Sequence, residues 1–208
     1  QELVVASVHA FGYRRGKRYA NQKNLKLHVG SGVHLKDGFV NIDYCKAADV
    51  RLDLRRSLPF SDGSADLLYS EHFVEHLSYP EGVEQFFADS FRVLDVGGII
   101  SLSVPDTDWP LEESSEWLAA CDQHGWHPPE CSTRMEHLNY HFRQRWRGRM
   151  EGHFECHRFA WDFETMKLKL EQAGFISVEE RSFDPSLDSS HREVGSLFVQ
   201  ATKPSKSS

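Results

Sequence analysis

Short apolar runs that each end at a turn recur along the first half of the chain. Residues 25–29, 39–42, 50–54 and 65–69 are typical of short β-strands, and residues 99–104 of a buried strand closed by Pro105. A helix is expected between the last two strands. Its first turn accommodates Pro80, its apolar side chains recur at helical spacing, and Gly97-Gly98 is expected to stop it.

The later part of the chain returns to the pattern of strands and helices after an interruption. Residues 107–158 lose the pattern and are rich in Trp, His, Glu and Arg, which suggests an inserted cap or lid. Asp162 is a plausible N-cap for a helix that ends at Gly174, and residues 175–180 and 196–201 are the last two expected strands. The order of elements predicts an α/β fold with a mostly parallel sheet flanked by helices.

Length and composition are consistent with one domain over residues 1–208, with a disordered tail at 203–208. The hydrophobic share of 39% is enough for a core, and the net charge of −7 does not suggest a nucleic-acid binder. No apolar run is long enough for a membrane span, and residues 1–13 are too short and interrupted for a signal peptide. The chain does not begin with Met, which is compatible with a missing upstream segment.

Four scattered cysteines do not form a disulfide framework, so a cytoplasmic location is expected. Basic residues gather in two places, within residues 3–36, which contain no Asp or Glu, and at 143–149. Solvated surface is the preferred interpretation of both, ahead of a patch for an anionic partner.

The first candidate site follows the first expected strand. Glycines at Gly30 and Gly32, on either side of Ser31, let the backbone approach a ligand at the carboxyl ends of the strands. A dinucleotide fingerprint needs a third glycine where Leu35 stands, so a nicotinamide cofactor is disfavoured. Asp43, at the next strand end, has two acceptor oxygens suited to two ribose hydroxyls.

A third polar position ends the third strand. Asp53 is placed to accept from an adenine amino group, with Leu54 packing on the ring. Either aspartate by itself is equally well explained as a turn residue. Two acids at successive strand ends after a glycine turn favour the cofactor interpretation.

Several segments of the chain resemble a known family. The segments LHVGSG, GFVNID, LPFSDGSADLLYSEHFVEHL and FRVLDVGG, followed later by RFAWDFETMKLKLEQAGF, are similar to S-adenosylmethionine-dependent methyltransferases of the type 11 group. The resemblance implies a class I Rossmann-like fold, with a seven-stranded sheet and an insertion after strand five. It implies S-adenosylmethionine as cofactor and leaves the acceptor open.

The resemblance also assigns roles residue by residue. Gly30, Ser31 and Gly32 would line the methionine moiety, Asp43 would hold the ribose with Tyr44 beside it, and Asp53 and Leu54 would flank the adenine. Ser70, Glu71 and His72 would face the sulfonium and the acceptor. The chain departs from the family at His28, where many relatives have an acid, and at the missing third glycine.

Two histidine-rich stretches raise the question of metal. His72 to His76 matches H-x-x-E-H, a zinc motif when helical, but the family has a similar stretch with no metal implied. The insertion holds Cys121, His124, His127 and Cys131 at a spacing that matches no recognised finger. No metal ligand is therefore expected in either place, and surface or pocket histidines are the preferred interpretation.

The expected chemistry is methylation of a small-molecule or saccharide-type acceptor, by O-methylation. A hydroxyl acceptor benefits from a base with a pKa near 7, so His72 is the first candidate, followed by Asp106 and His157. The alternative is a non-catalytic module of the same fold that binds a protein or an anionic partner. A nucleic-acid methyltransferase is disfavoured because Ser70-Glu71-His72-Phe73 stands where an Asn-Pro-Pro-Tyr motif would be. The acceptor and the oligomeric state are left open.

Overall fold

The computed structural model describes residues 2–108, 123, 136, 139 and 156–205. Three α-helices and seven strands are defined in these parts. The helices are α1 (Glu2–Gly16), α2 (Glu81–Val93) and α6 (Phe163–Gln172). The strands are β1 (Leu25–Val29), β2 (Val40–Asp43), β3 (Val50–Arg51), β4 (Ala65–Glu71), β5 (Leu94–Pro105), β6 (Ile176–Glu180) and β7 (Ser196–Thr202).

All seven strands form one sheet in the order β3-β2-β1-β4-β5-β7-β6. The five strands from β3 to β5 run parallel to their neighbours, whereas β7 is antiparallel to both β5 and β6. The predicted mostly parallel seven-stranded sheet is therefore confirmed. The carboxyl ends of β1, β2 and β4 meet at one edge, which is where an open α/β sheet binds its ligands.

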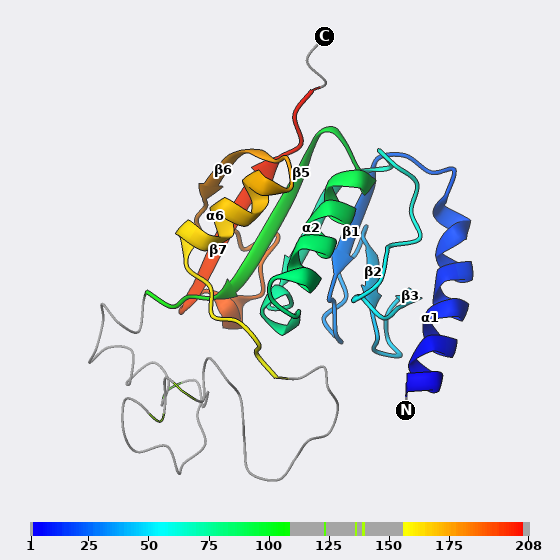
Figure 1. Cartoon of the computed structure of the whole chain (residues 1–208), viewed down its shortest axis with the longest axis horizontal. Helices are drawn as coiled ribbons and strands as arrows, with labels where there is room; N and C mark the ends of the chain where they lie inside the picture. Colours follow the sequence, from blue (N-terminus) through cyan, green and yellow to red (C-terminus); the bar gives the residue numbers. More distant parts are fainter. Residues whose placement is uncertain (1, 109–122, 124–135, 137–138, 140–155, 206–208) are drawn as a thin grey trace.

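The core lies between the sheet and the helices α2 and α6, which cover the same face (Figure 1). The strands contribute side chains that are completely shielded from solvent, such as Leu27, Ile42 and Leu68. Phe87 of α2 and Met166 of α6 are equally buried against them. Alternation along the strands and helical spacing in α2 bring these apolar side chains onto facing surfaces.

Three short turns of 3₁₀ helix complete the described structure. They are η1 (Lys17–Tyr19), η2 (Val74–His76) and η3 (Ser190–Arg192). The turn η2 directly follows β4 and carries part of the H-x-x-E-H stretch. Because η2 is a single turn and His72 precedes it, the two histidines do not share a face of one helix.

The boundaries of some elements differ from the predictions. The helix α2 ends at Val93, and Gly97-Gly98 lie inside β5 instead of stopping the helix. The strand β3 has two residues instead of the expected five. Lys203, at the start of the expected tail, donates its backbone N–H to Gly98 O at 2.9 Å, so ordered structure reaches this residue.

The helix α1 was not predicted. It lies beside β3 at the edge of the sheet (Figure 1). A Cβ atom at Gly12 would lie 1.8 Å from Arg51 O, so only glycine permits this close approach of helix and strand.

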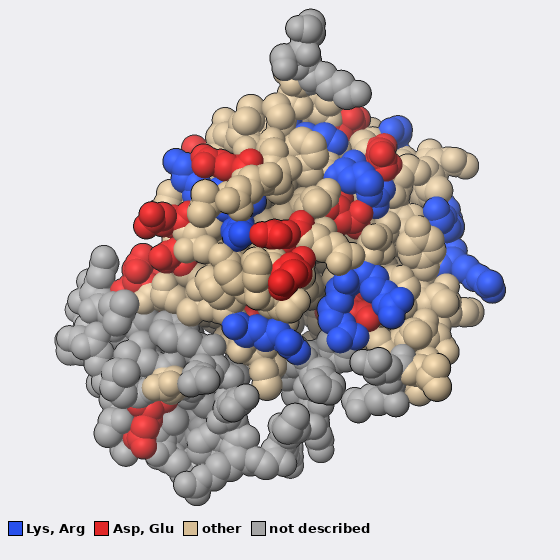
Figure 2. Space-filling model, viewed as in Figure 1, with Lys and Arg blue, Asp and Glu red and all other residues tan. Residues whose placement is uncertain are grey.

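Charged side chains of both signs are interspersed over the face in Figure 2. The second basic run, at 143–149, and most of the predicted cap at 107–158 lie outside the described residues. No helix in the described part of the chain has both the length and the apolar character needed to cross a bilayer.

Candidate active site

The glycine loop after β1 is shaped by contact with the residue that follows His72. Gly30 has a φ of 78°, in the region that favours glycine, and a Cβ there would lie 2.5 Å from Cβ of Phe73. The backbone N–H of Gly30 donates to Ile42 O at 2.9 Å. The loop after β1 is therefore held against the end of β2 and against the segment after β4.

Asp43, the last residue of β2, stabilises this loop. Its Oδ2 accepts a hydrogen bond from Gly32 N at 3.1 Å, and its Oδ1 accepts one from Cys45 N at 2.6 Å. A carboxylate oxygen has two acceptor sites, so each oxygen keeps one for a ligand hydroxyl.

Asp53 is buried and bound to a neighbouring arginine. Its two carboxylate oxygens accept from Arg55 Nε at 2.8 Å and Arg55 Nη2 at 2.9 Å. Burial by itself raises the pKa of Asp53, but the hydrogen bonds and charge of Arg55 outweigh that effect and lower it. The Asp53 carboxylate is thus ionised and already engaged by a guanidinium.

His72 occupies a strained position just after β4. Its φ is 49°, which is uncommon for a residue with a Cβ atom, and its N–H donates to Ser103 O at 2.8 Å. The Nε2 atom lies 2.8 Å from Ser196 Oγ, which orients the ring. Backbone strain of this kind is concentrated at functional sites.

Two neighbouring pockets meet at His72. The larger has a volume of about 670 Å³, and the smaller, of about 160 Å³, also contains Glu71, His191 and Arg192. Gly30, Gly32 and His72 line both. The position of the ring between two cavities suits a group that acts on one ligand next to another.

Most of the predicted cofactor residues come together here. The larger pocket is lined by Gly30, Gly32, Asp43, Tyr44, Asp53 and Leu54, together with His72. Ser31 and Glu71 line the smaller one. Ser70 is completely buried in β4 and lines neither pocket.

Glu71 is held by the segment before η3. Its Oε1 accepts from Tyr69 OH and from Ser189 N, each at 2.9 Å, and its Oε2 accepts from Ser189 Oγ at 2.6 Å. Burial raises the pKa of Glu71, but these hydrogen bonds outweigh it and lower the pKa overall. Glu71 therefore carries a negative charge at the wall of the smaller pocket.

The three predicted base candidates separate in the structure. His157 lies close to His72, because both approach the carboxylate of Glu75, at 3.8 Å and 3.6 Å from Oε1. Asp106 follows β5, where its Oδ1 accepts from Asp108 N at 2.9 Å, and like His157 it lines neither pocket. The geometry thus groups His157 with His72 and leaves Asp106 apart.

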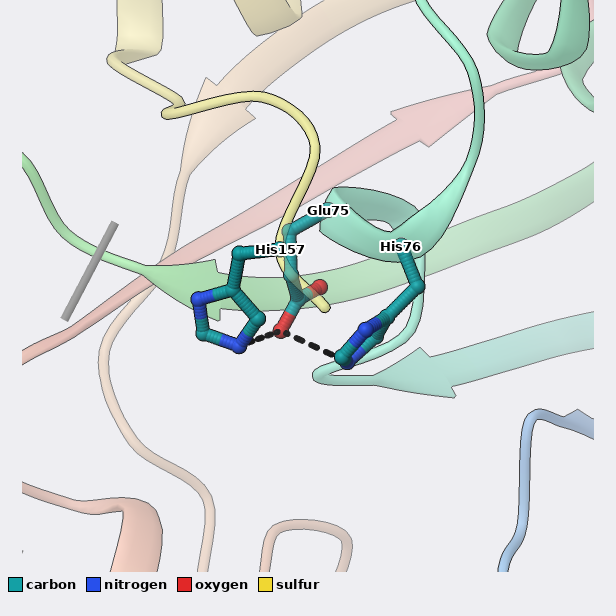
Figure 3. Close-up of side chains that lie close together, drawn as sticks. All are labelled: Glu75, His76 and His157. Atoms are coloured by element: carbon teal, nitrogen blue, oxygen red, sulfur yellow. Dashed lines mark ion pairs between the residues drawn. The ribbon is translucent and has the colours of Figure 1, made fainter. Parts of the chain in front are cut away.

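Glu75 is the centre of a histidine cluster. Its carboxylate lies between the rings of His76, on the same turn η2, and His157, on the segment before α6 (Figure 3). Both Nε2 atoms are 3.8 Å from Glu75 Oε1. Burial raises the pKa of Glu75 to about 8 and lowers the pKa of His76.

Several lining residues were not predicted from the sequence. Arg55, Phe73, His76 and Arg158 all line the larger pocket. Only His76 had a visible signal, as the last residue of H-x-x-E-H. Arg158 reaches the pocket because its backbone N–H donates to Glu75 O at 2.7 Å, a contact between distant parts of the chain.

His28, where the family resemblance led us to expect an acid, belongs to the interior. It is 1% exposed, its Nδ1 lies 3.2 Å from Asn41 Oδ1, and its ring contacts Tyr69. Burial lowers the pKa of His28 to about 4, so the ring is neutral near pH 7.

A known family matches the part of the chain that contains the parallel strands and the glycine loop. Residues 20–102 match the methyltransferase domain family, from the residues before β1 to those in β5. No curated protein matches the chain in sequence.

Solved structures share the fold at low identity. An S-adenosylmethionine-dependent methyltransferase from Methanosarcina mazei is 16% identical with a TM-score of 0.54, covering 90% of this chain and 95% of its own. A possible exported protein from Bordetella parapertussis is 17% identical with a TM-score of 0.51, covering 95% of this chain and 67% of its own.

A third match is a phosphoethanolamine N-methyltransferase from Haemonchus contortus, 13% identical with a TM-score of 0.48. It covers 94% of this chain, which spans only 53% of that enzyme. Over residues 20–102, which lie on this seven-stranded sheet, the chain is similar to the methyltransferase domain family.

Proposed function

We propose that the protein transfers a methyl group from S-adenosylmethionine to a hydroxyl of a small-molecule or saccharide-type acceptor. The observation that carries the proposal is the position of His72, which lines both the larger and the smaller pocket. In this proposal the cofactor binds in the larger pocket. The reacting hydroxyl lies next to His72, in the smaller pocket.

The larger pocket supports the cofactor assignment by volume and by chemistry. Its volume of about 670 Å³ suits a ligand of cofactor size. Gly30 and Gly32 face the methionine part, and the remaining acceptor sites on Asp43 bind the ribose hydroxyls. Asp53 and Leu54 lie beside the adenine, with the Arg55 guanidinium next to them.

The smaller pocket supports a polar acceptor. His34, Glu71, His191 and Arg192 line it and offer both donors and acceptors of hydrogen bonds, as the hydroxyls of a saccharide require. The His72 imidazole would accept the hydroxyl proton, and S-adenosylmethionine, when bound in the larger pocket, would supply the methyl group. The protein aligns the two reactants and excludes water.

The test combines His72→Gln with a radiolabelled cofactor and a panel of hydroxylated acceptors. Glutamine keeps polarity but takes no proton near neutral pH, so turnover at saturating cofactor should fall by about 10²–10⁴ while cofactor affinity in calorimetry is retained.

Two results would contradict the proposal. Turnover within a few-fold of the wild type would show that His72 only packs beside the cofactor. No calorimetric signal with S-adenosylmethionine in the wild-type chain would instead favour a non-catalytic module.

A further inference from the structure

The carboxylate of Glu75 is buried without a hydrogen-bond donor. Glu75 is 1% exposed, and no described residue donates a hydrogen bond to its Oε1 or Oε2. Burying a carboxylate in this way is costly unless another group compensates it. The Glu75 carboxyl is therefore either protonated or compensated by a positive partner, such as a metal ion.

Three imidazoles approach this carboxylate, and two of them are arranged as ligands. The Nε2 atoms of His76 and His157 each lie 3.8 Å from Glu75 Oε1, too far for a hydrogen bond. Their ring centroids are 4.9 Å apart (Figure 3). His72 is the third, but its Nε2 is engaged with Ser196 Oγ at 2.8 Å.

The spacing suits a metal ion of the zinc class. One ligand atom from each of Glu75, His76 and His157 lies within 4.8 Å of the others. Ligand atoms bound tetrahedrally to Zn²⁺ at about 2.0–2.1 Å lie about 3.3 Å from one another. Binding of the ion would require side-chain rotations that bring the three atoms from within 4.8 Å of one another to that separation.

We propose that Glu75, His76 and His157 bind a divalent transition-metal ion, with Zn²⁺ as the preferred occupant. Two imidazoles and one carboxylate select such an ion over Mg²⁺ or Ca²⁺, which prefer oxygen ligands. Three protein ligands leave a further coordination position open, as in catalytic zinc sites. His76 lines the cofactor pocket, so the ion would be bound at the wall of that pocket.

The ion would also fasten two distant segments together. Glu75 and His76 belong to η2, whereas His157 lies just before α6, and the backbone contact from Arg158 N to Glu75 O at 2.7 Å already joins them. This inference concerns metal binding and is independent of whether the proposed hydroxyl methylation is correct.

The experiment measures zinc directly on the full chain. After treatment with a chelator and exchange into metal-free buffer, Zn²⁺ is titrated in competition with a chromophoric chelator. One high-affinity ion is expected in the wild type, and Mg²⁺ at millimolar concentration should not displace it. Loss of a hydrogen-bond partner of a metal ligand already costs about 10–100-fold in affinity, so removal of two ligands by His76→Ala with His157→Ala should weaken binding at least about 10-fold.

Matched variants separate this site from the other histidines and cysteines. His9→Ala, on α1 and outside the cluster, should bind Zn²⁺ like the wild type. Glu75→Gln keeps the size of the side chain and should also weaken binding, so it provides the test if the double variant fails to fold. The Co²⁺ form should lack the charge-transfer absorption of thiolate ligands.

Three outcomes would overturn the proposal. The first is a wild-type chain that binds no Zn²⁺. The second is unchanged affinity in the folded Glu75→Gln or double variant, which would place the ion elsewhere. The third is a thiolate band in the Co²⁺ spectrum, which would assign the ion to cysteines.

Discussion

Asp43 stabilises the glycine loop before any ligand is present. Each of its carboxylate oxygens accepts one backbone hydrogen bond, from Gly32 and from Cys45. A loop fixed in this way does not need to be ordered when the cofactor binds, which lowers the cost of binding.

Asp43→Ala should weaken the binding of S-adenosylhomocysteine by about 1–3 kcal/mol, the loss expected when ligand hydroxyls lose an ionised partner. Calorimetry checks this, together with a 2′-deoxyribose analogue of the ligand. The analogue should bind the wild type more weakly but lose little further affinity in the variant, because the two changes remove one interaction. Unchanged affinity in a folded Asp43→Ala variant would contradict the ribose assignment.

His28 makes the stability of the protein depend on pH. Burial lowers its pKa from an ordinary value of 6.5 to about 4 in the folded chain. Between these two values the unfolded chain binds a proton that the folded chain does not. The free energy of unfolding is therefore expected to fall as the pH decreases through this window, by up to about 3 kcal/mol.

Urea unfolding of the wild type and of His28→Gln between pH 7 and 4.5 measures this contribution. The variant should lose less stability on acidification, since it has no group to protonate at this position. His34→Gln, a change at an exposed histidine, serves as the control and should keep the wild-type pH dependence. Identical pH dependence in the wild type and His28→Gln would show that other groups cause it.

At the scale of elements, α6 has the most complete set of local signals. Its N-cap Asp162 has extended backbone, and its Oδ1 accepts from Thr165 N at 2.8 Å. The buried side chains Met166 and Leu170 face the sheet. The sequence predicted this helix correctly because both the cap and the apolar stripe are local features.

Asp162→Ala should lower the free energy of unfolding by about 0.5–2 kcal/mol, because the N–H of Thr165 loses its acceptor. Thermal and urea unfolding are the measurements. Asp162→Asn keeps an acceptor oxygen at the N-cap and should retain most of the stability. Equal destabilisation by both changes would mean that the capping bond is not the cause.

The helix α1 shows where local signals fail. Its contact with β3 includes Gly12 and Gly16, which are buried against Arg51 and Pro59. Glycine normally weakens a helix and gives no apolar periodicity. The helix was not predicted because its close packing depends on two glycines, Gly12 and Gly16, and glycines leave no apolar pattern in the sequence.

At the scale of the whole molecule, the predicted insertion starts and ends at one place. Asp106 pairs with Trp161 in a parallel bridge, and Thr107 Oγ1 donates to Trp161 O at 2.9 Å. The ends of the segment are thus held together next to the carboxyl edge of the sheet. Its interior lies outside the described residues, so the cap over the acceptor stays a prediction from its aromatic content.

Hydrogen exchange in the presence of S-adenosylhomocysteine and an acceptor tests the cap. Peptides within residues 109–155 should gain protection when both ligands are bound, because a cap orders over an occupied site. Peptides from α2, whose core contacts do not involve the ligands, should be unchanged. Complete exchange of the segment at the unprotected rate under these conditions would contradict the cap.

The sequence by itself determined most of the strands, the helices α2 and α6, and several residues that line the larger pocket. Apolar runs located the strands because side-chain alternation is a local property, and strand-end residues such as Gly30 and Asp43 lie together because parallel strands share one edge. The resemblance to the type 11 methyltransferases added the number of strands and the cofactor.

The tertiary structure alone decided how the histidines are grouped. His76 and His157 are far apart in the chain, and they meet at Glu75 because Arg158 binds the η2 turn through its backbone. Asp106, which the sequence ranked with His157 as a base candidate, lies outside this cluster and, like His157, lines neither pocket. Side-chain periodicity specifies which face a residue occupies, whereas contacts across the fold depend on how the whole chain packs, and the burial of Glu75 arises only there.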